Sequence, residues 1–208
     1  IDPNNDLIVL DTETDRIRRI DGQGLISTIA GTVNNSGFSG DGGSATNARL
    51  NNPRAGAYDS RGNLYVHDFN NRRIRKIDTS GIITTVAGGG VSDGLPATDA
   101  SLNEPVSVVV ANDGTIFISD NGNHRIRRVD PGGIISTYAG TGSSGFSGDG
   151  GPAINARFNN PAGISLDGVG NLYVADRDNN RIRRVSPTGL ITTVAGTGET
   201  FGNLGDGG

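Results

Sequence analysis

Aspartate and arginine recur in this sequence at a fixed spacing. An arginine stands five positions after an aspartate in four places: Asp11 and Arg16, Asp68 and Arg73, Asp120 and Arg125, and Asp176 and Arg181. A carboxylate and a guanidinium that meet across a tight turn form a charge-assisted pair. Because the arrangement recurs through the whole chain, we interpret these pairs as structural contacts that hold hairpins together and not as catalytic groups.

The arginine of each pair opens a basic segment. Residues 16–20 read Arg-Ile-Arg-Arg-Ile, and similar segments occupy 73–77, 125–129 and 181–185. Alternate side chains of an extended chain point to opposite faces, so Arg18 and Arg19 face apart. An anionic partner such as RNA is one interpretation, and solvated or salt-bridged strand residues are the other. Aromatic residues make up only 5% and the net charge is −4, so we do not expect nucleic acid to be the partner.

Other groups that could carry out chemistry are few. The chain has two histidines, His67 and His124, and no cysteine, so it cannot build a three-histidine or cysteine zinc site alone. An octet, Ser-Gly-Phe-Ser-Gly-Asp-Gly-Gly, occurs at 36–43 and 144–151, but one carboxylate per copy lacks the converging oxygens that Ca²⁺ requires. We therefore assign no metal ligand, cofactor or catalytic residue, and expect Phe38 and Phe146 to anchor the octets on the fold.

Short strands must position these residues. The central isoleucines of the basic segments stand 57, 52 and 56 residues apart. Each repeat contains apolar runs of 4–6 residues bounded by Gly, Pro, Asn and Asp, which is the pattern of antiparallel strands joined by tight turns. A single four-stranded sheet of this size is marginal, so the repeated sheets must bury their faces against one another, as the blades of a β-propeller do. A linear solenoid is the weaker alternative, because β-solenoids use shorter repeats and parallel strands.

The residues also carry a family resemblance. Asn171–Asp176 followed by Asn180–Val185 resembles the NHL repeat, as do 63–68 with 73–77 and 115–120 with 123–126. The resemblance implies an all-β propeller of four-stranded antiparallel blades whose proline-led strand is innermost. We expect about four units: a partial, three-stranded blade at 1–33, blades at 34–90, 91–142 and 143–198, and the start of another at 199–208. Family propellers usually have six blades, so we expect part of a larger ring; a four-bladed ring and closure by self-association are the alternatives.

For function, we expect a non-catalytic scaffold that presents propeller loops to a protein or glycan partner. The candidate contacts are residues that break the repeat: Arg54, Tyr58, His67, Phe69 and Glu104. The family resemblance also implies an alternative, a lyase or metal-dependent hydrolase whose active site at the channel mouth is completed by blades outside this chain. No apolar run approaches 18 residues, so we expect no membrane insertion. The absence of cysteine, the single lysine and a pI near 5.1 suggest a secreted or cell-surface bacterial protein.

Overall fold

The computed structural model describes residues 1–90 and 96–199, which form strands and single-turn 3-10 helices. The strands are β1 (Leu7–Asp11), β2 (Arg16–Ile20), β3 (Ile26–Ala30), β4 (Pro53–Tyr58), β5 (Leu64–Asp68), β6 (Arg73–Ile77), β7 (Ile83–Gly88), β8 (Pro105–Val110), β9 (Ile116–Asp120), β10 (Arg125–Val129), β11 (Ile135–Ala139), β12 (Pro161–Leu166), β13 (Leu172–Asp176), β14 (Arg181–Val185) and β15 (Ile191–Ala195). The 3-10 helices are η1 (Thr12–Thr14), η2 (Ala45–Asn47), η3 (Ala97–Asp99), η4 (Asn121–Asn123), η5 (Ala153–Asn155) and η6 (Arg177–Asn179).

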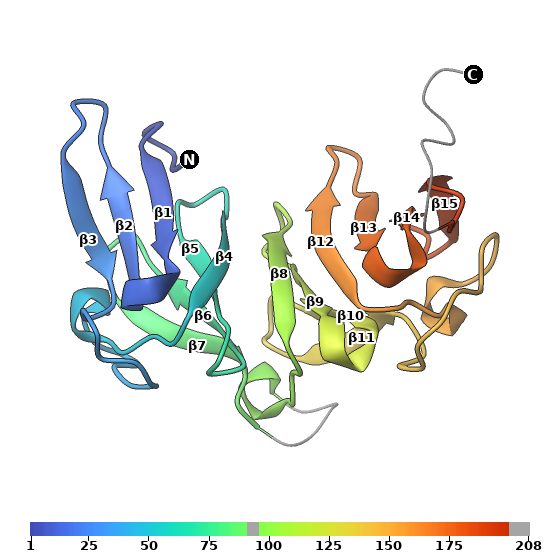
Figure 1. The fold of residues 1–208 in the computed structure, drawn as a ribbon, viewed down its shortest axis with the longest axis horizontal. Coiled ribbons are helices and arrows are strands. Elements are labelled where there is room, and N and C mark those ends of the chain that lie inside the picture. The colour runs from blue at the N-terminus through green and yellow to red at the C-terminus, as the bar shows by residue number, and fades with distance from the viewer. Residues whose placement is uncertain (91–95, 200–208) are drawn as a thin grey trace.

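The strands form four antiparallel meanders in chain order. The first sheet is β1-β2-β3, and the others are β4-β5-β6-β7, β8-β9-β10-β11 and β12-β13-β14-β15. Figure 1 shows these sheets following one another across the molecule, with the first (blue) and the last (red) at opposite ends. The predictions of an all-β fold and of a three-stranded first sheet are confirmed. Each described sheet lies inside one of the four predicted repeat units, whose boundaries stay a prediction.

The proline-led strands β4, β8 and β12 pack against one another in succession, as the inner strands of a propeller do. Proline has no N–H to donate, so it is tolerated at the first residue of a strand at a sheet edge. The pairing of each inner strand with its neighbour shifts register just after the proline. In β4 this bulge places Arg54 at the beginning of the strand, outside the regular ladder.

The segments between sheets fill the joints. In the first joint Ala45, Ala48 and Leu50 are buried in one cluster with Ile17 of the first sheet and Ile83 of the second. Backbone bonds connect the same segment to both sheets: Gly31 N–H donates to Ala45 O (2.9 Å), and Ala45 N–H donates to Gly81 O (2.8 Å). The pattern Ala-x-x-Ala-x-Leu/Phe recurs at 97–102 and 153–158 in the other two joints. Sequence analysis assigned these alanines no role.

Close packing explains why small residues are needed there. Gly40 has a φ of +88°, and a Cβ built on it would lie 2.7 Å from Ala48 Cα. Neither position has room for a larger side chain. The octets are anchored as expected, because the Phe38 ring lies under Arg73 (3.8 Å) and the Phe146 ring lies under Arg181 (3.8 Å). No helix in the described residues is long and apolar enough to cross a membrane.

Candidate functional site

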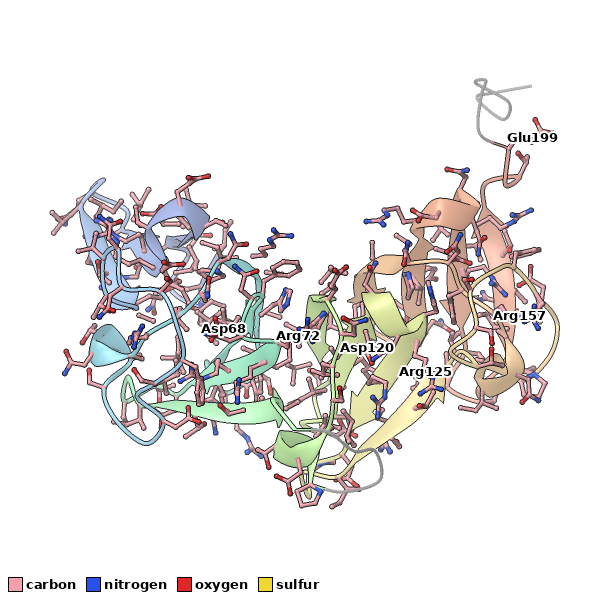
Figure 2. All side chains as sticks on the ribbon, turned by 60° about the horizontal axis from the view of Figure 1, so that its bottom comes forward. Asp68, Arg72, Asp120, Arg125, Arg157 and Glu199 are labelled. Carbon is pink, nitrogen blue, oxygen red and sulfur yellow. The ribbon has the colours of Figure 1, made fainter. Side chains whose placement is uncertain are left out.

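A buried aspartate ends the second strand of each four-stranded sheet. Asp68, Asp120 and Asp176 are fully buried, and Figure 2 shows the first two at matching places in neighbouring sheets. Asp68 accepts hydrogen bonds from Asn51 N–H (2.7 Å), from the Asn71 amide (2.8 Å) and from Arg75 (3.2 Å). The same three kinds of donor surround Asp120 (Asn103, Asn123, Arg127) and Asp176 (Asn159, Asn179, Arg183).

The arginine partner in these sheets differs from the one expected. In the first sheet Arg16 pairs with Asp11 at 3.4 Å, as the five-residue spacing suggests. In the other three sheets the carboxylate pairs with the arginine seven residues on, at 3.2–3.5 Å. The arginine five residues on turns elsewhere: Arg73 donates to Asn71 O, Arg125 to Thr141 O and Arg181 to Asn179 O. Residues two apart share a face of a strand, so both arginines can approach the aspartate, and the stacking on Phe38 holds Arg73 away.

These pairs belong to the scaffold. Arg75, Arg127 and Arg183 are buried, so they are not the solvated stripe that could meet RNA. Arg75 also pairs with Asp41 of the first octet and Arg183 with Asp149 of the second, both at 2.8 Å. Each octet carboxylate therefore ties its insert to the sheet. Burial raises the pKa of Asp68, and the hydrogen bonds from Asn71 and Asn51 and the charge of Arg75 oppose that rise.

Three of the five candidate binding residues lie together at the end where the inner strands begin. The Arg54 guanidinium carbon lies 3.5 Å from the centroid of the Phe69 ring. The His67 ring meets the same phenylalanine edge-on, with centroids 5.3 Å apart and planes at 77°. Arg54 is exposed, Phe69 is half-buried and His67 is fully buried. The three side chains form a stack that runs from the core to the surface.

His67 is the unusual member of this stack. Neither of its ring nitrogens has a hydrogen-bond partner among the residues that the structure describes. Burial and, to a lesser degree, the charge of Arg54 lower the pKa of His67 to about 3, so the ring is neutral near pH 7. At the same place in the third sheet, Ser119 donates to the carbonyl of Pro161 in the next inner strand (2.6 Å). His67 therefore replaces a polar link between sheets with an aromatic contact.

The other two candidates are separate from this stack. Glu104 is exposed and directly precedes the inner strand β8. The hydrogen bond to Asp178 raises the pKa of Arg177 on η6, and the charge of Glu104 makes a smaller contribution to that rise. Tyr58 ends β4 at the opposite end from Arg54 and lines a cavity between the first two sheets. Burial raises the pKa of its hydroxyl.

Sequence reasoning missed Arg177 and Asp178. Both are exposed, and they form an ion pair at 2.8 Å on the turn that follows the repeated aspartate. The signal was present, because the two residues after that aspartate differ in every repeat: Thr-Glu, Phe-Asn, Asn-Gly and Arg-Asp. Over residues 1–90 and 96–199, no three His, Asp or Glu side chains group in a way that could hold a metal ion.

Comparisons with known proteins agree with this architecture. A family model described as the teneurin NHL domain matches residues 34–91 and 138–203, and the NHL repeat matches 102–129. The chain is 30% identical over 198 residues to Teneurin-1 of Mus musculus, covering 82% of this chain and 7% of the relative. It is 35% identical over 134 residues to Protein SUPPRESSOR OF QUENCHING 1, chloroplastic, of Arabidopsis thaliana, covering 58% of this chain and 12% of the relative. The chain thus spans about a tenth of the length of these relatives.

Solved structures show the same fold. A Bacteroides thetaiotaomicron protein of unknown function superposes with a TM-score of 0.68 at 24% identity, covering 93% of this chain and 46% of that one. A streptogramin B lyase gives 0.61 at 18% identity, covering 92% and 51%. A chain of a nidogen/laminin complex gives 0.63 at 20% identity, covering 92% and 62%. At these identities the likeness concerns the β-propeller fold alone, whereas the family models match most of the sequence: the chain belongs to the NHL-repeat family.

Proposed function

We propose that this chain is an interaction module that binds a protein partner at the end where β4, β8 and β12 begin. The observation that carries the proposal is the stack of exposed Arg54 on Phe69 above buried His67. Arginine and aromatic residues contribute most strongly to protein interfaces when the surrounding structure fixes their orientation. The ring of His67 supplies that support from below.

The geometry favours a protein over a glycan. A sugar would stack on an open aromatic face, but the Arg54 guanidinium covers the face of Phe69 at 3.5 Å. What remains exposed is a planar cation with donors suited to a carboxylate. Exposed Arg72, labelled in Figure 2, and exposed Arg177 lie on turns that follow the second strands of their sheets. We therefore expect the partner to present acidic side chains to this end of the propeller.

The wider setting is part of the same proposal. We propose that the chain is a module of a larger secreted or cell-surface protein, which the likeness to teneurins supports. The two sequence relatives described above come from a mouse and a plant, so they do not support a bacterial origin. The enzyme alternative gains no support from His67, because a base with a pKa of about 3 takes up few protons near neutral pH.

Site-specific crosslinking tests the proposal. A photo-crosslinking residue placed at position 54, in cells that express the whole parent protein, should capture a protein partner. The same residue at exposed position 23, on the turn between β2 and β3 at the opposite end of the sheets, is the control and should not capture it.

The affinity of that partner for purified variants then decides the question. Arg54→Ala and Phe69→Ala should each weaken binding by about tenfold or more, as interface anchors do. Gln23→Ala should change the affinity by less than about twofold. Equal affinities for all three variants, or weakening by Gln23→Ala alone, would place the partner elsewhere.

A further inference from the structure

One position in the joints between sheets holds a different side chain in each joint. In the third joint it is Tyr138 of β11, which packs edge-on against Phe117 with centroids 4.8 Å apart. Its hydroxyl donates to the carbonyl of Ser186 on the β14–β15 turn at 3.4 Å. Tyr138 belongs to the cluster that contains Leu172 and Val185 of the fourth sheet. The ring therefore fills the space between the third and fourth sheets.

The internal repeat identifies the counterparts of Tyr138. In the outer strand Tyr138 stands at the register shift, directly before Ala139. Ile29 and Val86 stand in the same place, before Ala30 and Ala87. The counterparts of Phe117 are Ile8 in the first joint and Tyr65 in the second; each is the second residue of its strand. The third joint thus holds two aromatic rings at these positions, the second joint one and the first joint none.

A cavity of about 500 Å³ occupies the first joint. Its walls include Ile29, Leu64 and Ile77, together with Tyr58 and Asp78. The third joint has a counterpart for each of these residues. In the same order, they are Tyr138, Leu172, Val185, Leu166 and the hydrogen-bond acceptor Ser186. The cavity is therefore lined by the positions that surround a tyrosine ring two sheets further along the chain.

The second joint supports this interpretation. A cavity of about 380 Å³ is lined there by Val86, Ile116 and Val129 with Asp130, the same set of positions, and Tyr65 forms part of its wall. In the third joint a cavity of about 480 Å³ lies beside the turns after β8 and β12. It is lined by Leu166, Asp113 and Asp167, and not by Tyr138.

The polar groups of the first cavity match a phenol. Ser186 O accepts from Gly189 N–H as well as from Tyr138, and Asp78 O accepts from Gly81 N–H in the same way. A carbonyl oxygen has two lone pairs, so Asp78 O can accept a second bond from a ligand hydroxyl. Arg19, which pairs with Asp6 at 3.7 Å, and Arg61 are also among the lining residues, as is the carboxylate of Asp2. The volume lies within the range of small-molecule sites, roughly 300–1,000 Å³.

We propose that the cavity between the first two sheets binds a 4-hydroxyphenyl group, with its ring on Ile29, Leu64 and Ile77 and its hydroxyl directed to the carbonyl of Asp78. The ligand is a small phenolic acid or a tyrosine side chain, which share this chemistry. The site lies at the other end of β4 from Arg54, so its test is independent of the proposed protein interface.

Methyl-resolved NMR of the full chain locates the site directly. Titration with 4-hydroxyphenylacetate should shift the methyl signals of Ile29, Leu64 and Ile77, with a dissociation constant of about 1 mM or below, as expected for a fragment of this size. Phenylacetate, which lacks the hydroxyl, should bind at least threefold more weakly. N-acetyltyrosine amide distinguishes the sources: binding as tight as that of the acid indicates a tyrosine side chain, and weaker binding indicates a free acid held by the arginines.

Two matched substitutions test the space itself. Ile29→Tyr copies Tyr138 and should weaken binding at least tenfold while leaving the fold unchanged. Val86→Tyr makes the same change in the second joint and should leave binding at the first joint unaltered. Unchanged binding by Ile29→Tyr, equal binding of phenylacetate, or methyl shifts absent up to about 10 mM or located elsewhere would overturn the proposal. If Ile29→Tyr does not fold, the methyl shifts of the unmodified chain still support or refute the site.

Discussion

Substitution of Arg75 should destabilise this protein far more than substitution of Arg73, although both arginines lie on the same face of β6. Arg75→Met keeps an apolar side chain of similar length and removes the guanidinium. That group is fully buried and contacts Asp68 at 3.2 Å and Asp41 at 2.8 Å. Arg73→Met is the matched control, because it removes the arginine that stands five residues after Asp68 but does not pair with it.

The structure sets the sizes of the two effects. Removing one member of a buried ion pair costs about 3–5 kcal/mol, because the remaining carboxylate stays buried without its countercharge. Arg73 loses a stacking contact with Phe38 and one hydrogen bond to Asn71 O, which together are worth about 1–2 kcal/mol. For a chain of this size, these costs lower the melting temperature by roughly 6–20 °C for Arg75→Met and 2–8 °C for Arg73→Met.

Protonation of Asp68 should make the stability cost of Arg75→Met depend on pH. Burial already raises the pKa of Asp68 above its ordinary value of 3.8, and loss of Arg75 removes one of the interactions that oppose this rise. When the folded-state pKa is raised, the native state holds the proton more tightly than the unfolded chain, so stability increases as pH falls through the folded pKa. The cost of Arg75→Met should therefore shrink as the pH falls through the raised folded-state pKa of Asp68, which lies above 3.8. Thermal and urea unfolding followed by circular dichroism measure both effects; a larger cost for Arg73→Met would refute the assigned pairing.

Two further predictions concern the core. The pKa of His67, about 3, lies below its ordinary value of 6.5, so the native state should lose stability relative to the unfolded chain as pH falls from about 6 to 4. His67→Leu should reduce that slope by up to about 1.4 kcal/mol per pH unit, measured by urea unfolding. An unchanged slope would show that His67 takes up its proton in the folded state. Ala156→Leu should cost about 1–3 kcal/mol by overfilling the third joint, whereas Ile154→Ala, at an exposed site in the same insert, should stay within about 0.5 kcal/mol; equal costs would contradict the role given to the alanines.

The sequence predicted the sheets well because the signals for them are local. Turn residues bound each short apolar run, and repetition confirms each run independently of the others. The three-stranded first sheet and the anchoring of Phe38 follow from such patterns, whereas the inner place of the proline-led strands was implied by the resemblance to the NHL repeat. The packing of the joints was harder to predict from the sequence. Ala-x-x-Ala-x-Leu/Phe repeats three times, but it forms neither a strand pattern nor a helical one, so nothing in it indicated burial between sheets.

The sequence alone does not show which of two arginines pairs with the buried aspartate. Arg73 and Arg75 lie on one face of β6, and which of them meets Asp68 depends on Phe38 and Asp41, which come from an insert more than 30 residues earlier. The candidate binding residues posed a similar problem. Arg54 and Tyr58 both break the repeat on β4, but four residues of strand separate them by about 13 Å. They therefore belong to opposite ends of the propeller and cannot share one small ligand.

The alanine-containing inserts explain how one joint can lack the ring at the position of Tyr138 without losing its core. In the first joint Ile17, Ala30, Leu50 and Ile83 are fully buried, although no ring takes the place of Tyr138. The insert covers these residues beside the outer strands, where its backbone is hydrogen-bonded to both sheets. The position of Tyr138 lies nearer the turns. The ring is therefore not needed to hold two sheets together, and its position is free to vary among joints. A repeat protein can open a cavity in this way with no change to the contacts that keep its sheets in order.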